Sequence, residues 1–352
     1  MALFSTTNIK IAGVASCVPR DSVDNLSLDL LDSGRREAFV ARVGIRTRRI
    51  APRSVCASDL CVSAAQQLLG EAGWKAGEVG ALVFVTQTPD LVLPGNSVMT
   101  QTRLGLSTSA LLLDLNQGCA GYVYGLASLS ALMQGAQIKR GLLLVGDTIS
   151  RLLSREDAST VPIFSDAGSA TLLEYSSEAE PMWFNLGSDG NGAAAICVQD
   201  GGSRNPFNPE SMTVRDAGPG IRRAPAHLAM QGVDVLQYCF RYVVPNIQEL
   251  LVTAGWLMSD ADYCVFHQAN RLLNDGLARK LGLSAAKIPE SLADYGNTSS
   301  ATIPVTMNHR LGDCLPQGKH KLVLSGFGAG FCWGSALVET DRIVCPPILE
   351  LL

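Results

Sequence analysis

Short apolar runs alternate with helix-length segments along this chain. In its first half, strands are predicted at 9–16, 81–88, 110–116 and 141–148. Helices are predicted between them at 58–73, 96–105 and 120–136. These strands are apolar almost throughout rather than at every second position, which is typical of a sheet that is buried on both faces. The pattern predicts an α/β fold.

A similar order of elements returns later in the chain. Strands are predicted at 169–176, 194–199, 263–268, 320–328 and 333–339. Helices are predicted at 227–255, with a bend at Pro245, and at 270–282 and 299–311. The chain therefore resembles two duplicated α/β halves, 1–180 and 181–352, joined around 176–190. If the halves pack together, they form a layered α-β-α-β-α arrangement. The stretch 200–226 has no element pattern and is predicted to be a long loop.

Composition narrows the class of protein. Of the 352 residues, 47% are hydrophobic and 17% are charged, which is enough for a large core, and a net charge of −4 does not indicate a nucleic-acid partner. The chain does not start with a secretory signal pattern, and no 18-residue window is apolar enough to span a bilayer, so we expect a cytoplasmic protein with no membrane contact. The ten cysteines lack CxxC pairs and zinc-ligand spacing, which predicts free thiols and no metal site.

Cys119 is the first candidate for chemistry. It lies between an apolar strand and a long apolar helix, at a Gly118-Cys119 corner. Free backbone N–H groups and the positive end of the helix dipole favour an anion there, and thiols in such places have lowered pKa values. Cys119 is predicted either to be a nucleophile or, like most buried cysteines, to be a small core residue. The corner alone does not decide between the two.

His267 and Asn297 are the candidate partners of this thiol. Among four histidines, only His267 ends a predicted buried strand, which is where α/β sheets place their sites, although histidines that merely cap such strands are common. Asn297 lies in a turn before a predicted helix, where its amide could donate a hydrogen bond or could simply close an Asx turn. The glycine-rich turn 326–330 could bring backbone N–H groups close to a ligand oxygen, as in an oxyanion hole.

Six segments together resemble the β-ketoacyl-acyl-carrier-protein synthase III family of the thiolase superfamily. They are GIRTRRIA (44–51), NQGCAGYVYGL (116–126), FSDAGSATLL (164–173), VFHQAN (265–270), YGNTSSATIP (295–304) and SGFGAGFCWGSALV (325–338). They occur in the family's order and extend over nearly the whole chain. The resemblance implies a thiolase-like fold, a homodimer, and thioester substrates without a separate cofactor.

The resemblance also implies roles for residues. Cys119 would carry the acyl group, and His267 and Asn297 would hydrogen-bond the thioester carbonyl of a malonyl-type extender while carbon dioxide leaves. The amides of Cys119 and Ala329 would form a second oxyanion hole, with Phe327 and Gly328 in the same site loop. Leu93 would reach into the acyl channel of the partner subunit.

Two positions depart from the family pattern. Members that accept acyl-coenzyme A commonly clamp its adenine between a tryptophan and an arginine, but Ala38 and Ala158 stand at those positions here. Loss of that clamp leaves open whether the donor is a coenzyme A thioester or an acyl carrier protein.

An arginine-rich segment favours the carrier protein. Seven arginines lie between 35 and 53 against the single acid Glu37, and Arg271 follows the HQAN motif, with Arg279 and Lys280 further along. Such a patch could steer an acidic carrier protein or could be a solvated charged face. We expect Arg42, Arg46, Arg48 and Arg271 to bind the carrier or the donor.

Three functions follow from these residues. The first is a condensation with loss of carbon dioxide that gives a β-ketoacyl product. The second is acyl transfer from Cys119 to a hydroxyl or amine, without decarboxylation and with His267 as general base. The third, a non-catalytic subunit of an active paralogue, is disfavoured because such subunits usually lose the cysteine or the histidine.

Overall fold

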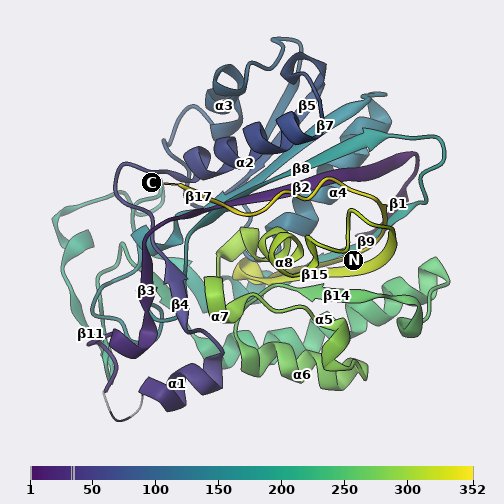
Figure 1. Cartoon of the computed structure of the whole chain (residues 1–352). Helices are drawn as coiled ribbons and strands as arrows, with labels where there is room; N and C mark the ends of the chain where they lie inside the picture. Colours follow the sequence, from purple (N-terminus) through teal and green to yellow (C-terminus); the bar gives the residue numbers. More distant parts are fainter. Residues whose placement is uncertain (1, 33, 35, 352) are drawn as a thin grey trace.

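The computed structural model describes residues 2–32, 34 and 36–351, and in it two sheets and three helical layers are stacked as α-β-α-β-α (Figure 1). One outer layer holds α2 (Ala57–Glu71) and α3 (Asn96–Leu104). The central layer holds α4 (Gly121–Gly135) and α8 (Thr302–Leu311). The other outer layer holds α5 (Gly232–Ala254) and α6 (Arg271–Leu281). The predicted α/β class and layer order are confirmed.

The larger sheet has six strands. Their order is β17 (Leu349–Leu351), β2 (Ile9–Pro19), β8 (Ala167–Tyr175), β7 (Arg140–Asp147), β5 (Ala81–Val85) and β6 (Leu111–Leu115). The predicted strands of the first half all lie in it. Because β5 and β7 are covered by helices on both faces, their residues are buried almost without exception.

The smaller sheet repeats this order. It runs β1 (Ala2–Thr6), β9 (Met182–Ser188), β16 (Cys332–Asp341), β15 (Lys319–Gly328) and β14 (Tyr263–Phe266). Both β2-β8-β7-β5 and β9-β16-β15-β14 have two antiparallel pairings followed by a parallel one. The shared order and directions support a duplicated unit.

The two ends of the chain exchange sheets. The N-terminal strand β1 pairs with β9 of the second half, and the C-terminal strand β17 pairs with β2 of the first half. The division into 1–180 and 181–352 therefore stays a prediction about the repeat, and each half contributes one end strand to the sheet of the other.

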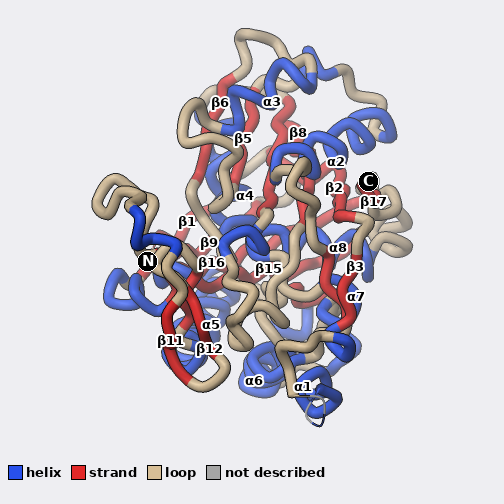
Figure 2. Tube along the Cα trace, turned by 90° about the vertical axis from the view of Figure 1, so that its left-hand side faces the viewer, coloured by secondary structure: helices blue, strands red, loops and turns tan. Residues whose placement is uncertain are grey.

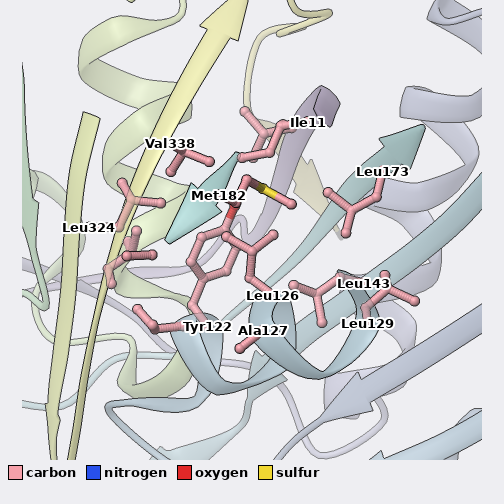
Figure 3. Close-up of a cluster of buried hydrophobic side chains, with 14 of the residues drawn as sticks. Ile11, Tyr122, Leu126, Ala127, Leu129, Leu143, Leu173, Met182, Leu324 and Val338 are labelled. Atoms are coloured by element: carbon pink, nitrogen blue, oxygen red, sulfur yellow. The ribbon is translucent and has the colours of Figure 1, made fainter. Parts of the chain in front are cut away.

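Helix α4 joins the two sheets through one apolar core (Figure 3). Its side chains Tyr122 and Leu126 point toward residues of both sheets, among them Leu173 of β8 and Leu324 of β15. Gly125 permits this approach, because a Cβ atom there would lie 2.7 Å from Leu143 and 2.8 Å from Val85. The tight packing fixes the start of α4, which is where Cys119 lies.

Several predicted boundaries are wrong, and each error comes from strand pairing between distant segments. The supposed join 176–190 contains β9, a central strand of the second sheet. The segment 227–231 is not helical, because β13 (Leu228–Met230) pairs with β10 (Ile196–Val198) in a separate two-stranded sheet, and α5 begins only at Gly232.

The predicted long loop 200–226 also contains structure. It holds the hairpin of β11 (Arg215–Gly218) and β12 (Ile221–Arg223), which stands at one side of the molecule (Figure 2). The remaining short elements are β3 (Ser22–Asp24), which pairs with β4 (Thr47–Arg49), and the helices α1 (Arg36–Val43) and α7 (Leu292–Tyr295).

Three general expectations concern the cysteines, membrane crossing and metal binding. All ten cysteines are free thiols. Within residues 2–32, 34 and 36–351, no helix combines the length and the apolarity that crossing a membrane requires. In the same residues, no three His, Cys, Asp or Glu side chains come together in a way that could hold a metal ion.

Candidate active site

Cys119 lies two residues before the first turn of α4, as the sequence predicts. The Gly121 N–H donates to the Gly118 carbonyl at 2.6 Å, which closes the corner. A side chain at Gly118 would meet the amide group of Gln87, which would have to move aside. The corner therefore places a small residue and the thiol at the N-terminus of the central helix.

The end of β15 closes over the thiol. A Cβ atom at Gly328 would lie 2.6 Å from the Cys119 sulfur, and one at Gly326 would lie 2.8 Å from the Cys119 carbonyl. The backbone N–H of Ala329 hydrogen-bonds the thiol. The glycines of the 326–330 turn thus let backbone amides reach the sulfur, which fits the predicted oxyanion hole.

The resting Cys119 thiol differs from the sequence-based expectation. Burial raises its pKa to about 12, the Ala329 amide opposes this rise, and the charge of Asp147 adds to it. Only 9% of the residue is exposed, so the cost of removing a thiolate from water outweighs the helix dipole. The prediction of a lowered pKa is wrong, and Cys119 rests as a neutral thiol.

His267 follows β14 and is held on two sides. Its backbone N–H donates to the Ser325 carbonyl at 2.8 Å, and its Nδ1 lies 2.7 Å from the Thr302 hydroxyl. The edge of its ring meets the ring of Phe327 at 89°, with centroids 5.5 Å apart. Burial lowers the pKa of His267 to about 3, and a backbone hydrogen bond at Ser299 opposes this shift. The imidazole is therefore neutral at physiological pH.

Asn297 closes the predicted Asx turn, and its amide group stays a candidate donor to a ligand. Its Oδ1 accepts from the Ser299 N–H at 2.9 Å, which is the Asx turn, and its backbone is held by Ile163 and Ser165. Its Nδ2 has only a long 3.5 Å contact with the Ala269 carbonyl. The amide donor is thus fixed in place and available to a ligand.

One cavity brings these groups together. It has a volume of about 380 Å³, and its lining includes Cys119, His267, Asn297, Phe327 and Gly328. Its walls are otherwise mostly apolar, which is typical of a ligand site with a few fixed polar groups. A neutral imidazole, a side-chain amide and a thiol thus face a largely apolar cavity.

Asp147 is an essential part of this arrangement that the sequence analysis missed. This fully buried carboxylate ends β7 and accepts from the Thr86 and Thr88 hydroxyls and the Gln87 N–H on one oxygen. Its other oxygen accepts from the N–H and the hydroxyl of Ser300. A charged residue at the end of an apolar strand, in GLLLVGDT, was the available signal.

The neutral state of His267 makes stability depend on pH. In the unfolded chain a histidine takes up a proton near pH 6.5, whereas folded His267 takes one up only near pH 3. The unfolded state binds more protons between these values, so this contribution to the free energy of unfolding is complete above about pH 6.5 and falls by about 1.4 kcal/mol per pH unit on acidification.

Chemical denaturation of the wild type and of His267→Gln at several pH values measures this effect. The difference between their free energies of unfolding should shrink steadily from pH 6.5 to pH 4.5. A difference that stays constant over that range would contradict a buried neutral histidine.

Comparisons with known proteins agree with this geometry. Residues 113–190 match the family model 3-oxoacyl-[acyl-carrier-protein] synthase III, and residues 251–340 match its C-terminal model. The β-ketoacyl-[acyl-carrier-protein] synthase III of Streptococcus pneumoniae is 30% identical over 335 residues, which cover 94% of this chain and 98% of that protein. This chain belongs to the β-ketoacyl-acyl-carrier-protein synthase III family.

Solved structures support the same assignment. A 3-oxoacyl-(acyl-carrier protein) synthase from Burkholderia xenovorans is 36% identical, with a TM-score of 0.93 and 99% of both chains covered. The priming β-ketosynthase of the R1128 polyketide pathway is 26% identical, with a TM-score of 0.82 and coverage of 97% of this chain and 99% of that one. The predicted family, thiolase-like fold and acyltransferase class are confirmed.

The arginines expected to bind a carrier lie in different surroundings. Arg42 is exposed and lines the cavity around Cys119. Arg271 lies close to Arg42, because its guanidinium donates to the Ala41 carbonyl where α6 approaches α1. Arg46 forms a bidentate ion pair with Asp24, with N···O distances of 2.6 and 2.7 Å. Arg48 is only 3% exposed, so it cannot belong to a surface that docks a protein. Arg35 lies outside the described residues.

The structure also places Ala38 and Ala158, which stand where the adenine clamp is expected. Ala38 is exposed on α1, next to Phe39, which lines the cavity. Ala158 donates its N–H to the Gly220 carbonyl at 3.0 Å and is thereby joined to the β11–β12 hairpin. Leu93 is 82% exposed, away from the cavity of its own chain.

Proposed function

We propose that this chain forms an acyl-Cys119 intermediate and condenses it with a malonyl-type thioester to give a β-ketoacyl product. The observation that carries the proposal is the meeting of Cys119 with two neutral N–H donors, His267 and Asn297, in one cavity. A donor that is neutral before and after reaction can stabilise a developing oxyanion without taking up a proton.

The Cys119 sulfur bonds to the acyl carbon of the donor thioester, whose thiol leaves with the proton of Cys119. The malonyl thioester then loses carbon dioxide, and the electron pair of the broken bond forms an enolate. His267 and Asn297 hydrogen-bond the enolate oxygen. The carbanion attacks the acyl-Cys119 thioester, and the sulfur leaves and regains a proton.

Thr302 supports the required form of His267. The Thr302 hydroxyl proton can be donated either to Nδ1, at 2.7 Å, or to the Ser299 carbonyl, at 3.3 Å. We assign it to Nδ1, which places the ring proton on Nε2, where it can be donated to the enolate oxygen. The pKa of about 3 also makes this histidine a weak general base at neutral pH. Direct acyl transfer to a hydroxyl or amine, which needs such a base, is therefore the less favoured function.

Intact-protein mass spectrometry tests the first step. Incubation with a panel of acyl-coenzyme A and acyl-carrier thioesters should add one acyl mass to the wild type and none to Cys119→Ala. Cys332→Ala, which removes another partly exposed thiol, should be acylated like the wild type. Acylation of the Cys119→Ala protein would contradict the proposal, and release of carbon dioxide after addition of malonyl thioester distinguishes condensation from simple acyl transfer.

We infer that the acyl donor or the extender arrives on an acidic carrier protein that docks at Arg42 and Arg271. Arg42 is exposed and lines the cavity, and Arg271 has only a distant ion pair, at 4.0 Å, with Glu290. Arg42 is exposed and Arg271 is partly exposed, and two such charges near the cavity are suited to steering an acidic partner. A coenzyme A thioester is the other possible donor, although Ala38 and Ala158 offer its adenine neither an aromatic face nor a guanidinium.

Replacing both Arg42 and Arg271 with alanine should raise KM for the carrier-borne substrate by about threefold to tenfold. Exposed ion pairs contribute at most about 1 kcal/mol each. The matched control is Arg222→Ala on the β11–β12 hairpin, where the arginine already pairs with Glu156 and should not change KM. Steady-state kinetics at low ionic strength measures the effect, and an unchanged KM in the double variant would exclude this docking site.

A homodimer is part of the proposal. Strand β6 is an edge of the larger sheet, and the exposed apolar side chains of Leu91, Val92 and Leu93 lie in the same half of the chain. Such an edge and loop are suited to pairing with a second copy, with Leu93 entering the partner's acyl channel. The ten free thiols support a location in the cytoplasm.

A further inference from the structure

A second cavity, larger than the catalytic one, is bordered by four arginines. Its volume is about 730 Å³, and Arg48, Arg53, Arg151 and Arg155 line it. It lies between the β3–β4 pair and the segment 150–161, and it shares no lining residue with the cavity around Cys119. The proposed catalytic steps make no use of it.

The positive charge of this cavity is only partly offset, by the buried Asp166, which interacts electrostatically with Arg48 and Arg151. Within residues 2–32, 34 and 36–351, none of the four guanidinium groups forms a salt bridge with a carboxylate. The nearby carboxylate of Asp166 accepts instead from the Ala51 and Ser150 N–H groups and from the Ser150 hydroxyl. Four arginines with few counter-charges around one hollow favour an anionic ligand.

Two of the arginines are fixed in place before any ligand binds. The buried Arg48 donates from Nε to Asn25 Oδ1 at 2.8 Å. Arg151 donates to the carbonyls of Val55, at 2.6 Å, and Arg53, at 2.9 Å. The side chains of Arg53 and Arg155 are exposed. A pre-arranged guanidinium loses less freedom on binding an anion, which increases affinity.

The remaining walls are aliphatic. They are formed mainly by Val23, Leu28, Ile50, Leu153 and Val161. Such walls give an aromatic base nothing to stack on, but they suit a saturated hydrocarbon chain. The volume is within the range of small-molecule sites.

We propose that this cavity binds a small aliphatic anion, with a carboxylate or phosphate head on the arginines and a hydrocarbon chain against the aliphatic walls. Planar guanidinium groups match both head groups with paired, charge-assisted hydrogen bonds. The site adjoins the catalytic one through Arg48. A Cβ atom at Gly296, the neighbour of Asn297, would lie 3.3 Å from the Arg48 side chain, and Asn25 links Arg48 to the Pro162 carbonyl at 2.8 Å.

Isothermal titration calorimetry on the full chain tests the proposal with three probes of equal chain length: octanoate, octyl phosphate and neutral octanol. We expect one molecule of at least one of the anions to bind, and octanol to bind at least about tenfold more weakly, since a hydrogen bond to a charged group contributes about 1.5–3 kcal/mol. Preference for octanoate or octyl phosphate would identify the head group.

Two variants locate the binding site. Arg53→Ala with Arg155→Ala removes exposed charges only and should weaken anion binding at least about tenfold. Val161→Phe fills the cavity and should weaken it similarly while all arginines remain. The matched control, Arg279→Ala with Lys280→Ala, removes two exposed charges of α6 outside both cavities and should bind like the wild type. The proposal is overturned if neither anion binds, if octanol binds equally well, or if both cavity variants bind like the wild type.

Discussion

Replacing Asn297 with alanine should leave acylation of Cys119 intact but slow the loss of carbon dioxide from a malonyl thioester by about 10²- to 10³-fold, the usual effect of removing one oxyanion donor. The reason is the position of the side chain. Its Nδ2 has only a 3.5 Å contact with Ala269 in the resting protein and lines the catalytic cavity. In the proposed mechanism, acylation uses the thiol and the backbone amides of Cys119 and Ala329, which this substitution does not touch.

A second variant distinguishes loss of the Asn297 amide donor from disruption of the Asx turn. Asn297→Asp keeps the oxygen that accepts from the Ser299 N–H, so the Asx turn can remain, but it removes both N–H donors and adds a negative charge near the enolate. It should therefore decarboxylate at least as slowly as Asn297→Ala. The matched control is Thr298→Val, which changes a buried hydroxyl without a hydrogen-bond partner in the same turn and should remain close to the wild type.

Two measurements together test this assignment. Intact-protein mass spectrometry follows the acyl mass on Cys119, and release of carbon dioxide from malonyl thioester follows the second step. If Asn297→Ala and Asn297→Asp release carbon dioxide at the wild-type rate, Asn297 does not stabilise the enolate. If both variants also lose acylation, the turn around Asn297 maintains the structure of the whole site, and its effect is not confined to the release of carbon dioxide.

Asp147→Asn should lower the free energy of unfolding by about 3 kcal/mol, because it would leave a buried backbone donor without an acceptor. The Gln87 N–H points at one oxygen of Asp147 and the Ser300 N–H at the other. The amide of an asparagine has one oxygen acceptor, so its NH₂ group must face either the Gln87 N–H or the Ser300 N–H. Neither backbone N–H can become an acceptor. The three hydroxyl groups around Asp147 can reverse, but the two backbone groups cannot.

Asp114→Asn is the matched control. Asp114 accepts from the N–H of Ser97 on one oxygen and from the Ser97 hydroxyl on the other. An asparagine can keep the backbone hydrogen bond and meet the hydroxyl with its NH₂ group, so the free energy of unfolding should change by less than about 1 kcal/mol. Denaturant unfolding of both variants provides the measurement. Equal midpoints for Asp147→Asn and the wild type would show that the five hydrogen bonds of Asp147 contribute nothing net.

The loss of Asp147 should also affect catalysis. Ser300 follows Asn297 by three residues, and both of its hydrogen bonds to Asp147 hold the turn before α8 against β7 of the other half. A folded Asp147→Asn protein should therefore decarboxylate more slowly than it acylates.

The sequence by itself determined the layered fold, and it named the three residues, Cys119, His267 and Asn297, that the structure brings to one cavity. Strands that are buried on both faces have a local signature, a continuous apolar run, and these were placed correctly. Cys119, His267 and Asn297 each lie where a strand or turn meets a helix, and segments of that kind are visible in one sequence. Pairing between distant segments has no such signature, which is why the sequence predicts a connection where β9 lies and a helix over 227–231.

Only the tertiary structure decided the electrostatics. The basic segment 35–53 predicts one charged surface, but folding buries Arg48, pairs Arg46 with Asp24 and leaves Arg42 at the cavity. The same is true of Cys119, whose pKa is raised by burial although its place at a helix N-terminus predicts a lowered one. Desolvation and ion pairing depend on what the rest of the chain brings near a group. Sequence therefore names the candidate residues of the site, and the packing of the two halves sets their charges.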